Sequence, residues 1–152
     1  MGLLDRLNLT GSSRSRLLAK LAEITGRREM LAGRVARHSA MCSAPRLKEE
    51  LAAIAAKERE QVNLLRRILS DAGIWPREAE APAHDGSSNW ERVSNDVEML
   101  LRITIDLNKH LLDWNGEDPA IAAQLDAILE GDGLVMRRLR EVAAKSDPQA
   151  LN

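Results

Sequence analysis

The sequence is poor in aromatic residues and in cysteine. It has no Phe and no Tyr, and it has 3 Trp among 152 residues. Because β-sheets favour aromatic and β-branched side chains, this absence in a chain rich in Ala, Leu, Glu and Arg predicts an all-α protein. The single Cys42 excludes a disulfide within the chain, and such sparse cysteine is typical of the reducing cytoplasm. We therefore expect a helical, cytoplasmic protein.

Long apolar runs and common catalytic motifs are also missing. No run approaches the roughly 20 apolar residues that span a bilayer, so no membrane span is expected. There is no Gly-rich phosphate loop and no Gly-x-Ser-x-Gly, and the three histidines are scattered. Hydrophobic content of 44% and charged content of 30% are ordinary for one globular domain. The composition therefore favours a soluble bundle over a recognisable enzyme.

Apolar residues recur at three- and four-residue spacing in four segments, which predicts four helices. Pro45 and the Asp118-Pro119 pair suit helix starts, and Gly73 suits a helix end. The expected helices cover about 13–42, 45–73, 88–115 and 118–146. Together they form one bundle over 13–147, preceded by an arm at 1–12 and followed by a tail at 148–152. Thr10 to Ser13 is predicted to be a flexible joint between the arm and the bundle.

The lengths of the three connections predict the topology. The first and last are short, so each joins a pair of antiparallel helices. The middle one, residues 74–89, contains prolines, a glycine and serines. Its 16 residues can reach about 50 Å when extended, whereas a helix of 28 residues is about 42 Å long. Two hairpins joined by a full-length crossover is the ferritin-like antiparallel four-helix arrangement.

Four polar residues fall on or beside the apolar stripes. Glu58 and Gln61 interrupt the second stripe, Asp132 interrupts the fourth, and Glu98 lies at the edge of the third, where it is expected to face inward. Polar groups are costly to bury without partners. We therefore expect these side chains to be held by other helices, by a metal ion or by water.

Two stretches resemble bacterial ferritin-like, rubrerythrin-like proteins. One is RHSAMCSAPRLKEELAAIAAKEREQVNLLRRILSDAG, which ends at Gly73, and the other is the last helix with the C-terminal end, from DPAIAAQLDAILE to RRLREVAAKSDPQAL. The resemblance implies two metal ions, usually iron, between the helices. Each hairpin would give a carboxylate from its first helix and a Glu-x-x-His from its second.

The resemblance assigns ligand positions residue by residue, and both histidines are missing. Glu58 matches the glutamate of the second helix, and Gln61 stands in place of the histidine. Glu98 matches the carboxylate of the third helix. In the fourth helix the match is Asp132 with Val135, favoured by the core periodicity, or Glu130 with Gly133. Glu29 and Glu23 are the nearest candidates in the first helix.

These departures predict a vestigial metal site built on Glu58, Glu98 and Asp132, with Glu29 as a further candidate. We expect the inward polar residues to be held by one another and by arginines such as Arg28. The expected function is then a non-catalytic structural or interaction subunit, as a homodimer or within a larger assembly, without cofactor. The alternative is a metal-binding protein that handles iron or acts as an oxidoreductase, with iron or manganese in an altered carboxylate site.

Charge is unevenly distributed along the chain. Residues 1–48 hold 10 Lys or Arg against 3 Asp or Glu, and residues 49–152 hold 12 against 20. A basic helix could bind nucleic acid through the following residues: Arg14, Arg16, Lys20, Arg27, Arg28, Arg34 and Arg37. Interleaved aromatics and base-reading motifs are missing, so no nucleic-acid binding is expected. We expect this face to be solvated or to meet the acidic remainder of the chain.

His38 and Cys42 lie four residues apart and would face the same way on a helix. A structural zinc site needs four ligands, and no second pair of ligand types is near. The expected role of His38 is therefore that of a hydrogen-bonded or half-exposed histidine.

Overall fold

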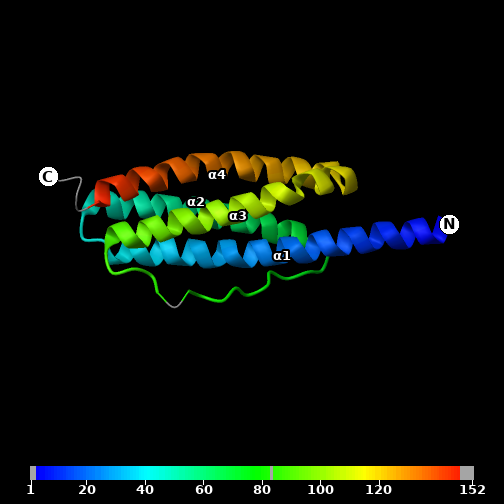
Figure 1. Cartoon of the computed structure of the whole chain (residues 1–152), viewed down its shortest axis with the longest axis horizontal. Coiled ribbons are helices and arrows are strands. Elements are labelled where there is room, and N and C mark those ends of the chain that lie inside the picture. The colour runs from blue at the N-terminus through cyan, green and yellow to red at the C-terminus, as the bar shows by residue number, and fades with distance from the viewer. Residues whose placement is uncertain (1–2, 83, 148–152) are drawn as a thin grey trace.

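The computed structural model describes residues 3–82 and 84–147, and the side chains of residues 3–12 lie outside that description. It is an all-α four-helix bundle, as predicted (Figure 1). The helices are α1 (Leu3–Met41), α2 (Pro45–Asp71), α3 (Asn89–Glu117) and α4 (Pro119–Ser146). The predicted tail at 148–152 falls outside the described residues.

The helices begin and end at capping residues, and Asp118 and Gly73 are two that the sequence predicts. Ser88 is the N-cap of α3, and its hydroxyl accepts a hydrogen bond from the Glu91 backbone N–H at 3.1 Å. Asp118 is the N-cap of α4 and accepts from the N–H groups of Ala120 and Ile121 at 3.1 and 3.2 Å. Gly73 follows α2 with a φ of +72°, which a glycine adopts without strain.

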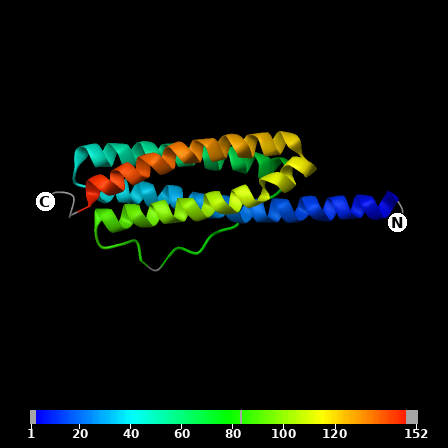
Figure 2. The same ribbon diagram turned by 45° about the horizontal axis from the view of Figure 1, so that its top comes forward.

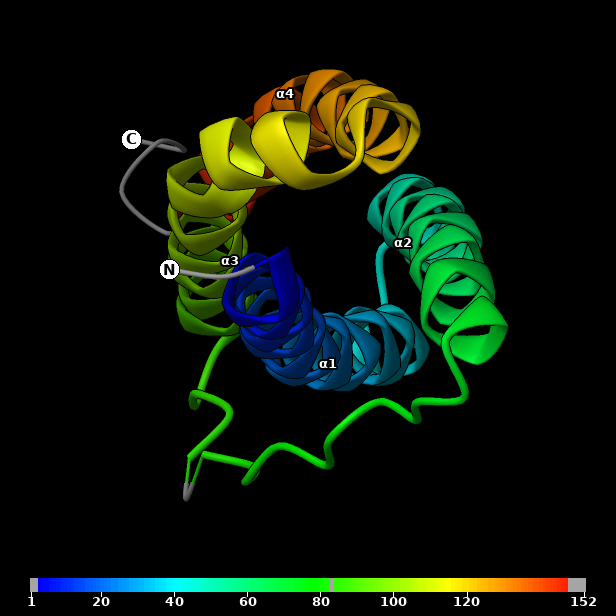
Figure 3. The ribbon, with the colours of Figure 1, turned by 90° about the vertical axis from the view of Figure 1, so that its right-hand side faces the viewer.

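The four helices form two hairpins joined by a long connection, as the loop lengths predict. α1 packs against α2, and α3 packs against α4. The hairpins meet through α1 with α3 and α2 with α4, so α1 and α4 lie diagonally opposite (Figure 3). The connection between α2 and α3 runs along the outer side of α1, back to the end of the bundle where α1 finishes.

The beginning of α1 differs from the prediction. α1 has 39 residues and continues through Thr10–Ser13, where a flexible joint was expected. The beginning of α1 projects past the ends of the other helices (Figure 2). Each Gly or Ser destabilises a helix by at most about 1 kcal/mol relative to Ala. Good helix formers on both sides therefore allow the helix to continue through Thr10–Ser13. The side chains of the predicted arm at 1–12 lie outside the described ones.

The crossover touches α1 closely at Gly26. The Arg77 backbone N–H donates to the Ala22 carbonyl at 3.0 Å. A Cβ at Gly26 would lie 1.6 Å from the Arg77 carbonyl oxygen, so only glycine fits beneath this segment. Gly26 thus lets the crossover lie on the helix it passes.

The core is built from the apolar stripes of all four helices, with Leu31, Leu65, Leu100 and Leu139 among its fully buried members. None of the helices in the described chain carries a stretch apolar and long enough to cross a membrane.

Candidate functional site

The guanidinium of Arg28 lies in the middle of the bundle between two carboxylates. Its Nη1 and Nη2 donate to Oδ1 and Oδ2 of Asp132, both at 2.7 Å. Nη1 also donates to Glu58 Oε2 at 3.2 Å. The side chains of all three residues are at most 1% exposed. This is a bidentate, fully buried Arg–carboxylate pair with a second, longer carboxylate contact.

Each helix contributes one residue to this site. Arg28 comes from α1, Glu58 from α2 and Asp132 from α4, and Thr104 of α3 donates from its hydroxyl to Asp132 Oδ2 at 3.4 Å. Each of the three charged residues lies on the apolar face of its helix, so the packing of the stripes brings them together. We call Arg28, Glu58, Asp132 and Thr104 the central cluster.

The central cluster has one positive group for two carboxyl groups. Burial raises the pKa of Glu58, and the neighbouring charge of Asp132 raises it further against the opposing effect of Arg28. Burial works to lower the pKa of Arg28, but its hydrogen bond to Asp132 and the charges of both carboxylates outweigh it and raise that pKa. The guanidinium therefore stays charged, and burial favours the protonated form of Glu58.

Gln61 lies beside the central cluster without completing it. The side chain is buried on α2, and a Cβ at Gly131 of α4 would lie 2.5 Å from its Nε2. Gly131 therefore makes room for the amide. Within the described residues, Gln61 Oε1 and Arg28 Nε have no hydrogen-bond partner. The prediction that Gln61 faces inward is confirmed.

The residues predicted as metal ligands come together only in part. Glu58 and Asp132 converge, but the side chain of Glu98 is 59% exposed and accepts from Arg102 at 2.7 Å. The expectation that Glu98 faces inward is therefore wrong. Asp96 and Ile103 set the buried side of α3, and they turn Glu98 to the surface.

The other candidates also lie elsewhere. Glu29 forms an ion pair with Arg66 of α2 at the surface, and Glu130 is exposed. No group of three or more His, Cys, Asp or Glu in the described chain is placed to hold a metal ion. With Arg28 between the two converging carboxylates, the donor set does not fit a di-iron pair.

A second polar cluster joins α1 to α3 and to the crossover, with Arg34, His38 and Asp96 buried and Arg37 exposed. His38 Nδ1 lies 2.5 Å from Asp96 Oδ2, and Arg34 Nε donates to Asp96 Oδ1 at 3.3 Å. Asp85 of the crossover accepts from Arg37 Nε and Nη2 at 2.9 and 2.6 Å. The hydrogen bond from Arg37 holds the pKa of Asp85 below its usual value.

We call Arg34, Arg37, His38, Asp85 and Asp96 the latch cluster. It accounts for the hydrogen bonding of His38, and the sequence predicts only part of it. His38 is hydrogen-bonded, as expected, and Cys42 does not share a ligand with it but accepts weakly from Asn89 Nδ2 at 3.6 Å. Asp96 was overlooked, although it lies three residues after Val93 and four before Leu100. That spacing was the signal for a buried carboxylate.

The basic side of α1 meets the acidic part of its own chain, as expected. Arg27 pairs with Asp106 at 2.5 Å, and Arg14 pairs with Asp118 at 3.3 Å. Arg28 and the arginines of the latch cluster are also paired with carboxylates. These cations are therefore engaged inside the molecule.

A scan against known protein families found no match for this chain, and a search of curated proteins found none either.

Proposed function

We propose that this protein is a ferritin-like bundle that has lost its di-iron site and acts as a non-catalytic structural or interaction subunit. The observation that carries the proposal is Arg28, whose guanidinium lies between Glu58 and Asp132. The resemblance to ferritin-like proteins assigns these two carboxylates as former metal ligands. A fixed organic cation with a single positive charge then lies where the metal ions would lie.

An arginine in this position has different chemistry from a metal pair. It has no accessible redox change, and its proton cannot be removed under physiological conditions. It also occupies the lone pairs through which Asp132 would bind an ion. The Arg28 side chain is 0% exposed, so the guanidinium itself is closed to a substrate, although Asp132 and Thr104 line a groove between α3 and α4. Holding the two hairpins together is the role that remains.

The alternative, an altered carboxylate site for iron or manganese, has less support. It needs Glu98 or Glu29 beside Glu58 and Asp132, and both pair with surface arginines instead. It also needs Arg28 to leave a bidentate buried contact. We therefore favour the metal-free subunit.

The proposal is tested by oxidation of ferrous iron in air, followed by absorbance of the ferric product. The wild-type protein should oxidise iron no faster than buffer, and Glu58→Ala should behave in the same way. An oxidation rate well above buffer that Glu58→Ala abolishes would contradict the proposal and favour the alternative.

A further inference from the structure

The outer side of α3 carries large apolar side chains that the bundle leaves uncovered. Leu101, Ile105 and Leu112 are 40%, 47% and 80% exposed. Their spacing of four and seven residues puts them on one side of the helix. Single exposed leucines are ordinary, but a stripe on one helix indicates a contact surface.

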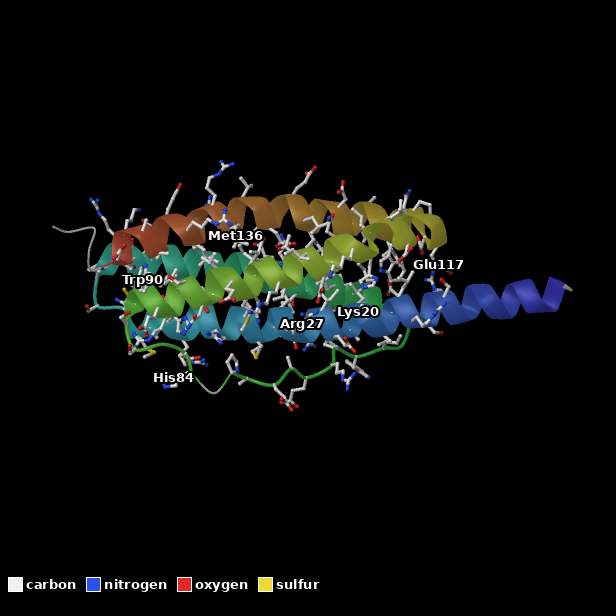
Figure 4. The ribbon with its side chains drawn as sticks, in the orientation of Figure 1. Lys20, Arg27, His84, Trp90, Glu117 and Met136 are labelled. Atoms are coloured by element: carbon white, nitrogen blue, oxygen red, sulfur yellow. The ribbon has the colours of Figure 1, made fainter. Side chains whose placement is uncertain are left out.

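The stripe borders a groove between α3 and α4. The groove has a volume of about 680 Å³, and Leu101, Leu129 and Met136 line it. Trp90, which is 41% exposed, lies near the beginning of the same helix, and Figure 4 labels it on α3 and Met136 on α4. We call the exposed side of α3 and α4 along this groove the α3/α4 face.

We propose that the α3/α4 face binds a second copy of the chain, with the helices of the two copies antiparallel about a two-fold axis. The charges on α4 favour this occupant. Asp126 and Arg140 are exposed, and each lies seven residues, about two turns, from Gly133. A two-fold axis at Gly133 therefore places each Arg140 against the partner's Asp126. Neither residue has an ion-pair partner within the described part of its own chain.

The apolar stripe fits the same axis. The 3.4 Å contact between Thr104 and Asp132 fixes the level of α3 against α4. Because these two helices are antiparallel, Gly133 of α4 lies level with Ile103 of α3. Leu101 and Ile105 lie two residues before and after Ile103, so the rotation places each against the other in the partner. One axis thus serves the charges and these two apolar residues.

Gly133 is a second observation at the proposed axis. Glycine costs a helix about 1 kcal/mol relative to alanine. A Cβ at this position would meet nothing within 4 Å in its own chain, so the fold does not need glycine there. Close approach of the partner's α4 backbone would need it.

The face has the size of a stable interface. Helices of 29 and 28 residues give a face about 42 Å long and about 20 Å wide. A face of these dimensions has room for the roughly 800 Å² that each partner contributes to a standard interface.

The test uses the full chain, whose mass is measured by light scattering after gel filtration and by sedimentation equilibrium. The wild type should have twice the mass of the 16.8 kDa chain. Ile105→Glu and Leu112→Glu should raise the dimer dissociation constant by about tenfold or more, because each places two charges in the symmetric interface. Leu134→Glu is the matched control, because Leu134 is also an exposed leucine, but it lies on α4 and does not line the groove. The mass of this variant should equal that of the wild type.

A charge-reversal cycle tests the arrangement itself. Arg140→Glu or Asp126→Arg alone should weaken the dimer, and the double variant should restore it. Arg138→Glu, another exposed arginine of α4, should leave it intact. A monomeric wild type, or a dimer that the groove variants leave unchanged, would overturn the proposal. It rests on the proposed function only in taking the bundle as an interaction subunit, and mass is measured independently of iron oxidation.

Discussion

Arg28 is the one cation that the buried carboxyl groups of Glu58 and Asp132 contact in the described chain. Arg28→Met keeps much of the side-chain volume but leaves Glu58 and Asp132 buried without a cation. We expect the free energy of unfolding to fall by about 3–5 kcal/mol, as measured by urea denaturation. The control Arg138→Met removes an exposed arginine and should change it by less than about 0.5 kcal/mol. A loss below about 1 kcal/mol for Arg28→Met would contradict this account of the central cluster.

The two carboxyl groups of the central cluster should contribute unequally to the free energy of unfolding. Asp132 makes two short hydrogen bonds to Arg28, whereas those of Glu58 are 3.2 and 3.4 Å. Glu58→Gln should keep the unfolding free energy within about 1 kcal/mol of the wild type. Asp132→Asn should cost about 2 kcal/mol more, because it removes charge-assisted bonds and turns an amide N–H₂ toward the guanidinium. Equal losses in urea denaturation would contradict this ranking.

Glu58 should also make stability depend on pH. Its pKa is raised in the folded protein, mainly by burial, so the native state holds a proton that the unfolded chain releases. The contribution is therefore fully present below the ordinary pKa of a glutamate and is lost as pH rises through the folded pKa. The unfolding free energy of the wild type, measured against Glu58→Gln, should fall across that range. A difference that rises with pH, or one that is independent of pH, would refute the assignment.

Individual inward residues could be predicted only where they break an apolar stripe. Glu58, Gln61 and Asp132 do so, and Arg28 could be named as their partner because buried carboxylates need a cation. Glu98 was misplaced because α3 has apolar residues on several sides, which leaves the phase of its buried face uncertain. The sequence does not say that one guanidinium contacts both carboxylates, since that depends on how α1, α2 and α4 meet.

At the level of elements, the crossover is positioned by the helix that it passes. Gly26→Ala would place a methyl group against the Arg77 carbonyl, so the segment should lift from α1. We expect faster cleavage of the crossover in limited proteolysis and a lower unfolding free energy. Gly33→Ala is the matched control, because a Cβ there meets nothing within 4 Å. It should stabilise the protein by about 0.5–1 kcal/mol. Stabilisation by both variants would show that the crossover does not need Gly26.

The helices could be predicted almost completely, since their period, caps and proline positions agree. The crossover could be predicted from its length, because a 16-residue connection can return along a bundle of this height. Its path over α1 could not, since it depends on single contacts at Gly26 and Asp85. The continuation of α1 to Leu3 was missed because weak helix formers at Gly11 to Ser13 do not end a helix by themselves.

At the level of the whole molecule, ion pairs link the basic first helix to later carboxylates, in addition to the apolar core. Hydrogen bonding from Arg27 lowers the pKa of Asp106, and backbone hydrogen bonds from Ile121 and Ala120, with Arg14, lower that of Asp118. The stability from such groups is present above their ordinary pKa and is lost as pH falls through the lowered values. We expect the midpoint temperature of thermal unfolding to fall when the pH is lowered below about 4. Asp106→Asn should make the midpoint temperature depend less on pH in this range. A variant whose midpoint temperature falls with pH as steeply as that of the wild type would contradict the role of Asp106.

The central claim is that an arginine fills the position where a ferritin-like bundle would hold metal ions. Its most direct test is the metal content of the purified full chain, by mass spectrometry, after incubation with ferrous iron or manganese and dialysis, beside Glu58→Ala. The account predicts the same trace content in both proteins. About two iron or manganese ions per chain, lost in Glu58→Ala, would contradict it.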